Sequence, residues 1–163
     1  MPQRPVVITF DDGDEDMVTN AFPILQKYNF VATSFIIVRW IDAPKFITSD
    51  QITQLAKAGW EIGSHSMSHV DLTQNENNLD YEVRESLVRL NADFKLKVTS
   101  FAYPFGVIDT NIVNYTSRAG YTAAVGLGTS VKQGYYDLYY LSRMEVRQEY
   151  EMDQFIAMLP WVD

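Results

Sequence analysis

Two histidines, four residues apart, are the side chains whose type and spacing first suggest chemistry. His65 and His69 are the only histidines in the chain. On a helical turn this spacing puts both imidazoles on one side, within reach of a single metal ion. Taken alone, such a pair is more often two surface or hydrogen-bonded histidines, so a second signal is needed to favour a metal site.

Two adjacent acids, Asp11 and Asp12, supply that signal. They follow the β-branched run of residues 5–10 and precede Gly13, so we expect them at the carboxyl end of a buried strand. Neighbouring like charges are unfavourable there unless a cation or a hydrogen-bonding network compensates them. The alternative for these acids alone is a turn with solvated carboxylates.

One carboxylate and two neutral imidazoles form a three-ligand site with open positions for water and substrate. The second carboxylate is then free to act as a general base towards a metal-activated water. The pattern therefore predicts metal-assisted hydrolysis of an amide or an ester.

The composition limits the other possibilities. A net charge of -8 argues against nucleic acid and anionic membranes as partners. Cysteine is absent, which excludes disulfides, a thiol nucleophile and a thiolate metal site. No run approaches the roughly 20 apolar residues of a membrane span, and residues 1–5 lack the pattern of a secretory signal. We expect a cytosolic protein, or a mature or excised domain, with these alternatives left open.

Strands and helices alternate with short connections, which is typical of βαβ units and a mainly parallel sheet. We predict one domain over residues 1–163 with an α/β fold. An open doubly wound sheet and an incomplete barrel both fit the pattern, and we expect an incomplete, distorted (β/α) barrel because five or six strands are too few for a full barrel. The expected strands cover residues 5–10, 31–38, 60–64, 98–102, 121–125 and 139–141. The expected helices cover residues 16–28, 49–58, 79–97, 109–118 and 150–159.

Three motifs in order carry a family resemblance. Thr9-Phe10-Asp11-Asp12-Gly13, His65-Ser66-Met67-Ser68-His69 and Phe101-Ala102-Tyr103-Pro104-Phe105-Gly106 resemble the motifs of polysaccharide deacetylases with a NodB homology domain, carbohydrate esterase family 4. The third has the form found in the poly-N-acetylglucosamine deacetylase branch. They extend from the start of the chain to about Gly106.

The resemblance implies the roles of individual residues. Asp12, His65 and His69 would hold a divalent metal, zinc or else cobalt, nickel or manganese. Asp11 would be the general base, and the backbone N–H of Phe105 would help to hold the developing oxyanion.

The resemblance also implies the substrate and the location. The substrate would be an N-acetylglucosamine-containing glycan, such as chitin oligomers, peptidoglycan or poly-N-acetylglucosamine, with O-acetyl xylan as a variant. The location would be extracellular or in the cell envelope. The oligomeric state is left open.

The chain departs from the family pattern in two places. Many relatives have an arginine where this chain has Ala102, so we predict that Arg143 orients the base instead; its alternative is a surface salt bridge. Relatives usually carry a late histidine that protonates the leaving amine, and this chain has no third histidine.

Aromatic residues near the expected rim suggest sugar stacking. We predict substrate contacts from Trp40, Tyr103, Pro104 and Tyr136. Two other functions remain open at this point: a non-catalytic descendant that binds metal and glycan, and a hydrolase of a small non-sugar amide on the same metal core.

Overall fold

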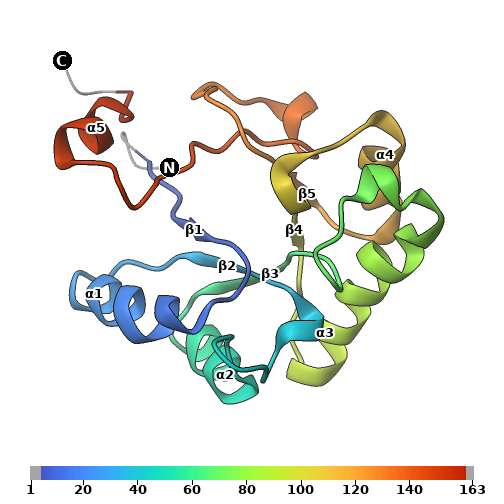
Figure 1. The fold of residues 1–163 in the computed structure, drawn as a ribbon, viewed down its shortest axis with the longest axis horizontal. Helices are drawn as coiled ribbons and strands as arrows, with labels where there is room; N and C mark the ends of the chain where they lie inside the picture. The colour runs from blue at the N-terminus through green and yellow to red at the C-terminus, as the bar shows by residue number, and fades with distance from the viewer. Residues whose placement is uncertain (1–4, 161–163) are drawn as a thin grey trace.

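A parallel sheet of five strands runs through the centre of the computed structural model, which describes residues 5–160 (Figure 1). The spatial order of the strands follows their order in the chain, and every neighbouring pair is parallel. The strands are β1 Thr9–Phe10, β2 Thr33–Ile36, β3 Glu61–Ser64, β4 Ser100–Ala102 and β5 Ala123–Val125. Residues 1–4 and 161–163, which include most of the leading segment considered for a secretory signal, lie outside the described residues.

The sheet curls without closing. Its edge strands are β1 and β5, and helices α1 to α4 lie around its outer side (Figure 1). The predicted incomplete (β/α) barrel is thus confirmed. The predicted sixth strand at residues 139–141 is wrong as a strand, because this segment forms only a single parallel bridge between Leu141 and Val125.

The helices occupy the predicted segments; four are shorter than predicted, and α4 has the predicted length but begins one residue later. They are α1 Phe22–Lys27, α2 Ser49–Lys57, α3 Ser86–Phe94, α4 Thr110–Ala119 and α5 Met152–Ala157. Wider π turns, η1 Met17–Ala21 and η5 Asp80–Glu85, lead into α1 and α3. Single 3₁₀ turns are η2 Val38–Trp40, η3 Leu72–Gln74, η4 Glu76–Asn78, η6 Pro104–Gly106 and η7 Tyr135–Asp137. None of the helices in residues 5–160 is long and apolar enough to cross a membrane.

Local signals explain where two of these helices begin. Thr48 and Gln51 form a capping box at the start of α2, each side chain binding the other residue's backbone N–H. The Asp109 carboxylate accepts the backbone N–H of Ile112 at 2.9 Å and caps α4. Gly120, with a φ of 112°, ends α4 in the left-handed conformation that glycine adopts without strain.

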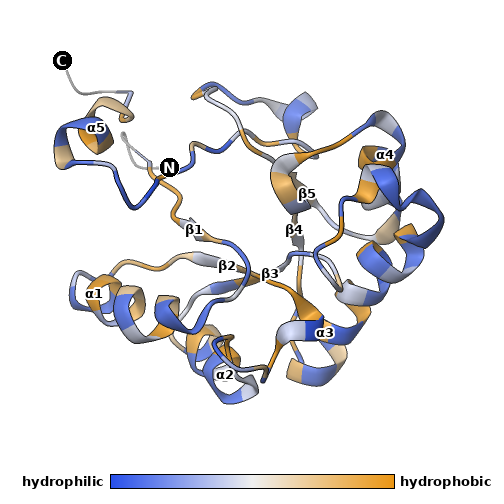
Figure 2. Cartoon of the chain, in the orientation of Figure 1, coloured by the Kyte–Doolittle hydropathy of each residue, from blue (hydrophilic) through white to orange (hydrophobic). Residues whose placement is uncertain are grey.

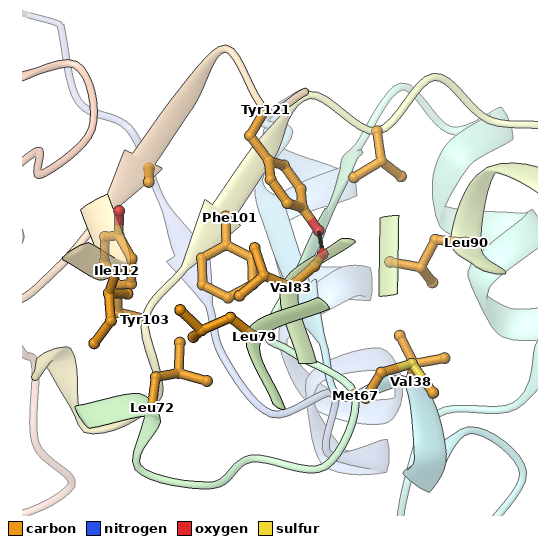
Figure 3. Close-up of a cluster of buried hydrophobic side chains, with 12 residues drawn as sticks. Val38, Met67, Leu72, Leu79, Val83, Leu90, Phe101, Tyr103, Ile112 and Tyr121 are labelled. Atoms are coloured by element: carbon orange, nitrogen blue, oxygen red, sulfur yellow. Dashed lines mark hydrogen bonds between the residues drawn. The ribbon is translucent and has the colours of Figure 1, made fainter. Parts of the chain in front are cut away.

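Two groups of buried side chains hold the helices against the sheet. One lies beneath α3 and α4, and in Figure 3 Phe101 and Tyr121 pack beside Val83 within it. There the Tyr121 hydroxyl donates to the Val83 backbone oxygen at 3.0 Å. The other group, which includes Ile36, Ile52 and Leu55, lies beneath α1 and α2. Figure 2 shows both hydropathy classes along the helices, as expected of helices with one buried face. These two cores fix the strands whose carboxyl ends carry the polar motifs.

Candidate metal centre and active site

The two histidines lie in an irregular turn that follows β3. The expectation of a helical turn is wrong, because Ser66 and His69 have positive φ angles of 68° and 59° and no helix forms between them. The Ser66 hydroxyl accepts the backbone N–H of His69 at 2.9 Å, which closes the turn. The imidazoles still converge, with ring centroids 4.8 Å apart, but through a folded loop.

Asp12 faces both imidazoles from the end of β1. Its Oδ1 lies 3.5 Å from Nε2 of His65 and 3.4 Å from Nε2 of His69. This oxygen is buried and has no hydrogen-bond partner among the described residues. An unpartnered buried carboxylate oxygen is unfavourable by itself, and a cation between the three side chains would compensate it.

The tautomer of His65 suits metal binding. Its Nδ1 lies 2.8 Å from the Ala102 backbone oxygen, which can only accept, so Nδ1 carries the proton and Nε2 presents its lone pair. Burial of the ring lowers the pKa of His65 from its ordinary value of 6.5, outweighing the opposite effect of the Asp11 charge. The imidazole is therefore neutral at pH 7, the form that binds a metal.

The distances fit one tetrahedral ion. Three atoms, one each from Asp12, His65 and His69, all lie within 4.8 Å of one another. Two ligands about 2.1 Å from a tetrahedral zinc would be separated by about 3.4 Å, close to the observed Asp12–His separations. The residues present therefore fit the divalent metal that the sequence motifs imply.

Asp11, the neighbouring acid, is held by Arg143. The guanidinium donates to both carboxylate oxygens at 2.7 Å, and also to Thr9 Oγ1 and the Gly126 backbone oxygen, each at 3.0 Å. Its carbon lies 5.4 Å from the centre of the Phe35 ring. Arg143 is mostly buried, with 14% of its side chain exposed, so the alternative of a surface salt bridge does not describe it. Asp11 Oδ2 lies 3.9 Å from His65 Nε2, which places this carboxylate at the edge of the cluster.

Phe105 lies opposite, in the turn η6 after β4. It has a φ of 60°, an uncommon conformation for a bulky residue, and its ring packs 4.5 Å from that of His69. Within residues 5–160 no acceptor takes its backbone N–H. This N–H is available to a ligand.

Of the four residues predicted to contact the substrate, only Trp40 has a ring close to that of a cluster histidine among the recorded aromatic contacts of residues 5–160. Trp40 is half-buried beside the cluster, with its ring 5.9 Å from that of His69. Tyr103 and Pro104 are buried, and the Tyr103 hydroxyl donates to the Tyr139 backbone oxygen, so the substrate contact predicted for these two residues stays a prediction. Tyr136 is fully exposed, and its one recorded ring contact is with Tyr135 rather than the cluster.

Several supporting groups were missed by the sequence reasoning. The Ser66 hydroxyl closes the histidine turn. The Thr9 hydroxyl and the Gly126 backbone oxygen accept hydrogen bonds from Arg143, and the Ala102 backbone oxygen orients His65. Ser66 was within reach of sequence reasoning, because a serine three residues before a turn residue often accepts its N–H. The backbone acceptors could not be predicted, because every residue type carries the same carbonyl oxygen.

An open hollow of about 360 Å³ shares Arg143 with this site. Its lining includes Leu127, Met144, Tyr150 and Met158. Among the described residues, Arg143 is the one lining residue that this hollow shares with the cluster described above.

Fold and site together define an α/β-barrel protein with a His–His–Asp cluster of the metal-ligand type at the carboxyl ends of its strands. The chain belongs to the polysaccharide deacetylase family, whose model matches residues 1–124. It is 28% identical to the poly-beta-1,6-N-acetyl-D-glucosamine N-deacetylase of Staphylococcus aureus strain MRSA252, over 91% of this chain and 56% of that protein. The chain thus spans about half the length of the curated relatives it matches.

Solved structures show the same fold. The Streptococcus pyogenes deacetylase PplD in complex with acetate superposes with a TM-score of 0.90 at 22% identity, over 97% of this chain and 71% of that one. BC0361, a polysaccharide deacetylase from Bacillus cereus, superposes with a TM-score of 0.85 at 26% identity, over 95% and 51% of the two chains.

Proposed function

We propose that residues 1–163 form one catalytic domain that removes N-acetyl groups from N-acetylglucosamine-containing glycans with the help of a divalent metal. The observation that carries this proposal is the unpartnered Asp12 oxygen facing two imidazoles, beside a second carboxylate fixed by Arg143. The named activity of the Staphylococcus aureus relative and the family membership support the same reaction.

Asp12, His65 and His69 would hold the metal. When bound, a divalent cation such as zinc supplies Lewis acidity towards the acetyl carbonyl and water. His65 is already set for this role, because the Ala102 oxygen fixes its tautomer and burial keeps it neutral.

Asp11 would act as the general base. Two hydrogen bonds from Arg143 hold its carboxylate at one edge of the cluster, where it can take a proton from the attacking water. The free N–H of Phe105 would donate to the oxygen of the acetyl carbonyl as negative charge develops on it.

The leaving amine needs a proton, and the chain has no third histidine to supply it. The proton that Asp11 takes from water can return to the amine nitrogen as the carbon–nitrogen bond breaks, so the same carboxyl group serves as base and then as acid. Acetate and a free amine on the sugar are the products.

The substrate we favour is poly-N-acetylglucosamine, peptidoglycan or chitin oligomers, with O-acetyl xylan as an ester variant. Trp40 beside His69 offers an aromatic face for a sugar ring, and the hollow next to Arg143 offers space for neighbouring residues of a polymer. Such substrates place the protein outside the cell or in its envelope.

The test combines metal analysis with acetate release from those four glycans. We expect Asp12→Ala and His69→Ala to lose the metal, and Asp11→Asn to keep the metal while losing most of the rate. Full activity of Asp11→Asn with its metal in place would refute the role of the base.

The missing third histidine favours one competing function, a protein that binds metal and glycan without turnover. Acetate release that depends on added metal would exclude it. Glycan binding without acetate release from any substrate would establish it.

A further inference from the structure

We propose that Glu82 is a positioning residue for the metal site, because its buried carboxylate fixes the turn that carries both histidines. The inference rests on the proposed function, in which His65 and His69 hold a metal. Glu82 lies in η5, on an element separate from the motifs described above.

Glu82 contacts the two residues in the middle of the turn. Its Oε2 accepts the backbone N–H of Ser68 at 2.9 Å, and its Oε1 accepts the Ser68 hydroxyl at 2.6 Å. Its backbone oxygen accepts the N–H of Met67 at 3.1 Å. Glu82 thus holds the segment between His65 and His69 through both of its carboxylate oxygens and its backbone oxygen.

The turn needs such support. Ser66 and His69 have left-handed backbone conformations, each of which costs a residue with a side chain free energy unless its surroundings impose it. From η2, the N–H groups of Val38 and Arg39 donate to the backbone oxygens of Ser66 and Met67 at 3.2 and 2.9 Å. The turn is therefore held between η2 and η5, and Glu82 supplies the η5 side.

The burial of Glu82 distinguishes this role from ordinary packing. The residue is 3% exposed, and within residues 5–160 no Lys, Arg or His nitrogen lies within ion-pair distance of its carboxylate. A buried carboxylate is unfavourable compared with a buried apolar side chain. The neighbouring residues Leu79 and Val83 are buried and apolar, so an apolar side chain would suit this position. An acid here is favourable if it orders the segment between two metal ligands.

The test measures zinc affinity by competition with a chelator, together with the visible absorption of the Co²⁺-loaded protein. We expect Glu82→Ala to bind zinc about 10- to 100-fold more weakly, as found for outer partners of metal ligands. We expect Glu82→Gln, which can still accept the Ser68 N–H, to lose less than about tenfold. The Co²⁺ spectrum of Glu82→Ala should change because its ligands are less well ordered.

Glu61 offers a matched control. Its carboxylate also accepts two hydrogen bonds, from Thr33 Oγ1 at 3.0 Å and Ser100 Oγ at 2.6 Å, but it lies at the opposite end of β3 from His65. We expect Glu61→Ala to lower thermal stability and leave zinc affinity within about twofold of the original protein.

Zinc binding by folded Glu82→Ala at the original affinity would overturn the inference, as would an equal loss in Glu61→Ala. If Glu82→Ala does not fold, Ser68→Ala decides the question, because it removes the hydroxyl that Glu82 Oε1 accepts, and unchanged zinc affinity in that variant also overturns the inference. Failure of the unmodified chain to bind zinc would instead refute the proposed function, so the two failures are distinguishable.

Discussion

At the scale of single residues, Asp11 and Asp12 show how the backbone separates two identical side chains. In an extended strand neighbouring side chains point to opposite faces. Here Asp12 and Gly13 have φ angles of 67° and 80°, so the chain turns as it leaves β1. Asp11 meets Arg143, and Asp12 meets the two imidazoles. The proposed base and the proposed ligand thus lie side by side with different partners.

Replacing Arg143 tests this separation. We expect Arg143→Ala to lower the rate of acetate release about 100-fold, because Asp11 loses the groups that orient it. Zinc affinity should change little, since the recorded hydrogen bonds and ion pair of Arg143 go to Asp11, Thr9 and Gly126 and not to Asp12, His65 or His69. Steady-state rates and chelator competition measure the two quantities.

Arg147 is the control for that change. Arg147 lies four residues after Arg143 and forms an exposed ion pair with Glu145, so Arg147→Ala should retain both the rate and the metal. Loss of zinc binding in Arg143→Ala would mean that the two carboxylates do not have separate roles.

At the scale of elements, sequence periodicity predicted most of the fold and part of the site. The β-branched runs and the Thr48 and Gly120 end signals identify strands and helices in the correct order. The histidine turn could not be predicted, because its left-handed residues are a serine and a histidine rather than glycine. The burial of Tyr103 was equally inaccessible, since a tyrosine after a strand suits a rim as well as a core.

A signal for Glu82 was present in the sequence. Leu79, Glu82, Val83, Ser86 and Leu90 follow helical spacing and are all buried. An acid and a serine within an otherwise apolar stripe indicate a buried polar contact. Periodicity shows that such a contact exists, but its partner, the Ser68 turn, comes from another element and only the folded chain identifies it.

Gly63 gives a prediction at this scale. A Cβ there would lie 2.5 Å from the ring of Phe35, the ring beneath Arg143, and 2.8 Å from Ser100 Oγ. We expect Gly63→Ala to lower the free energy of unfolding by about 1–3 kcal/mol, because β2 and β3 must shift to accommodate the methyl group. Urea denaturation measures the change.

Gly134 is the matched control, because the nearest atom to its added Cβ is a carboxylate oxygen at 3.7 Å. Gly134→Ala should leave the free energy of unfolding nearly unchanged. Equal effects at both positions would contradict the close packing of Gly63 on Phe35.

At the scale of the whole molecule, the metal site should contribute to stability. The proposed ligands lie in the segments that follow β1 and β3, so a bound ion would link segments more than fifty residues apart in the chain. An ion that binds only the folded protein, present at 100 times its dissociation constant, adds about 2.7 kcal/mol. For a chain of this size that corresponds to a shift in Tm of roughly 5–10 °C.

We therefore expect a chelator to lower Tm by that amount, measured by calorimetry with and without added zinc. His69→Ala should show no response to either treatment. A chelator response that persists in this variant would place the stabilising ion elsewhere.

The gap between β1 and β5 has a consequence for the order of assembly. Ion capture needs groups from the first 102 residues, namely three side chains and the Ala102 oxygen. The proposed base is oriented only when Arg143 returns across that gap to Asp11, 132 residues earlier in the chain. A chain that ended before this return would still contain every proposed metal ligand but would lack the residue that orients the proposed base.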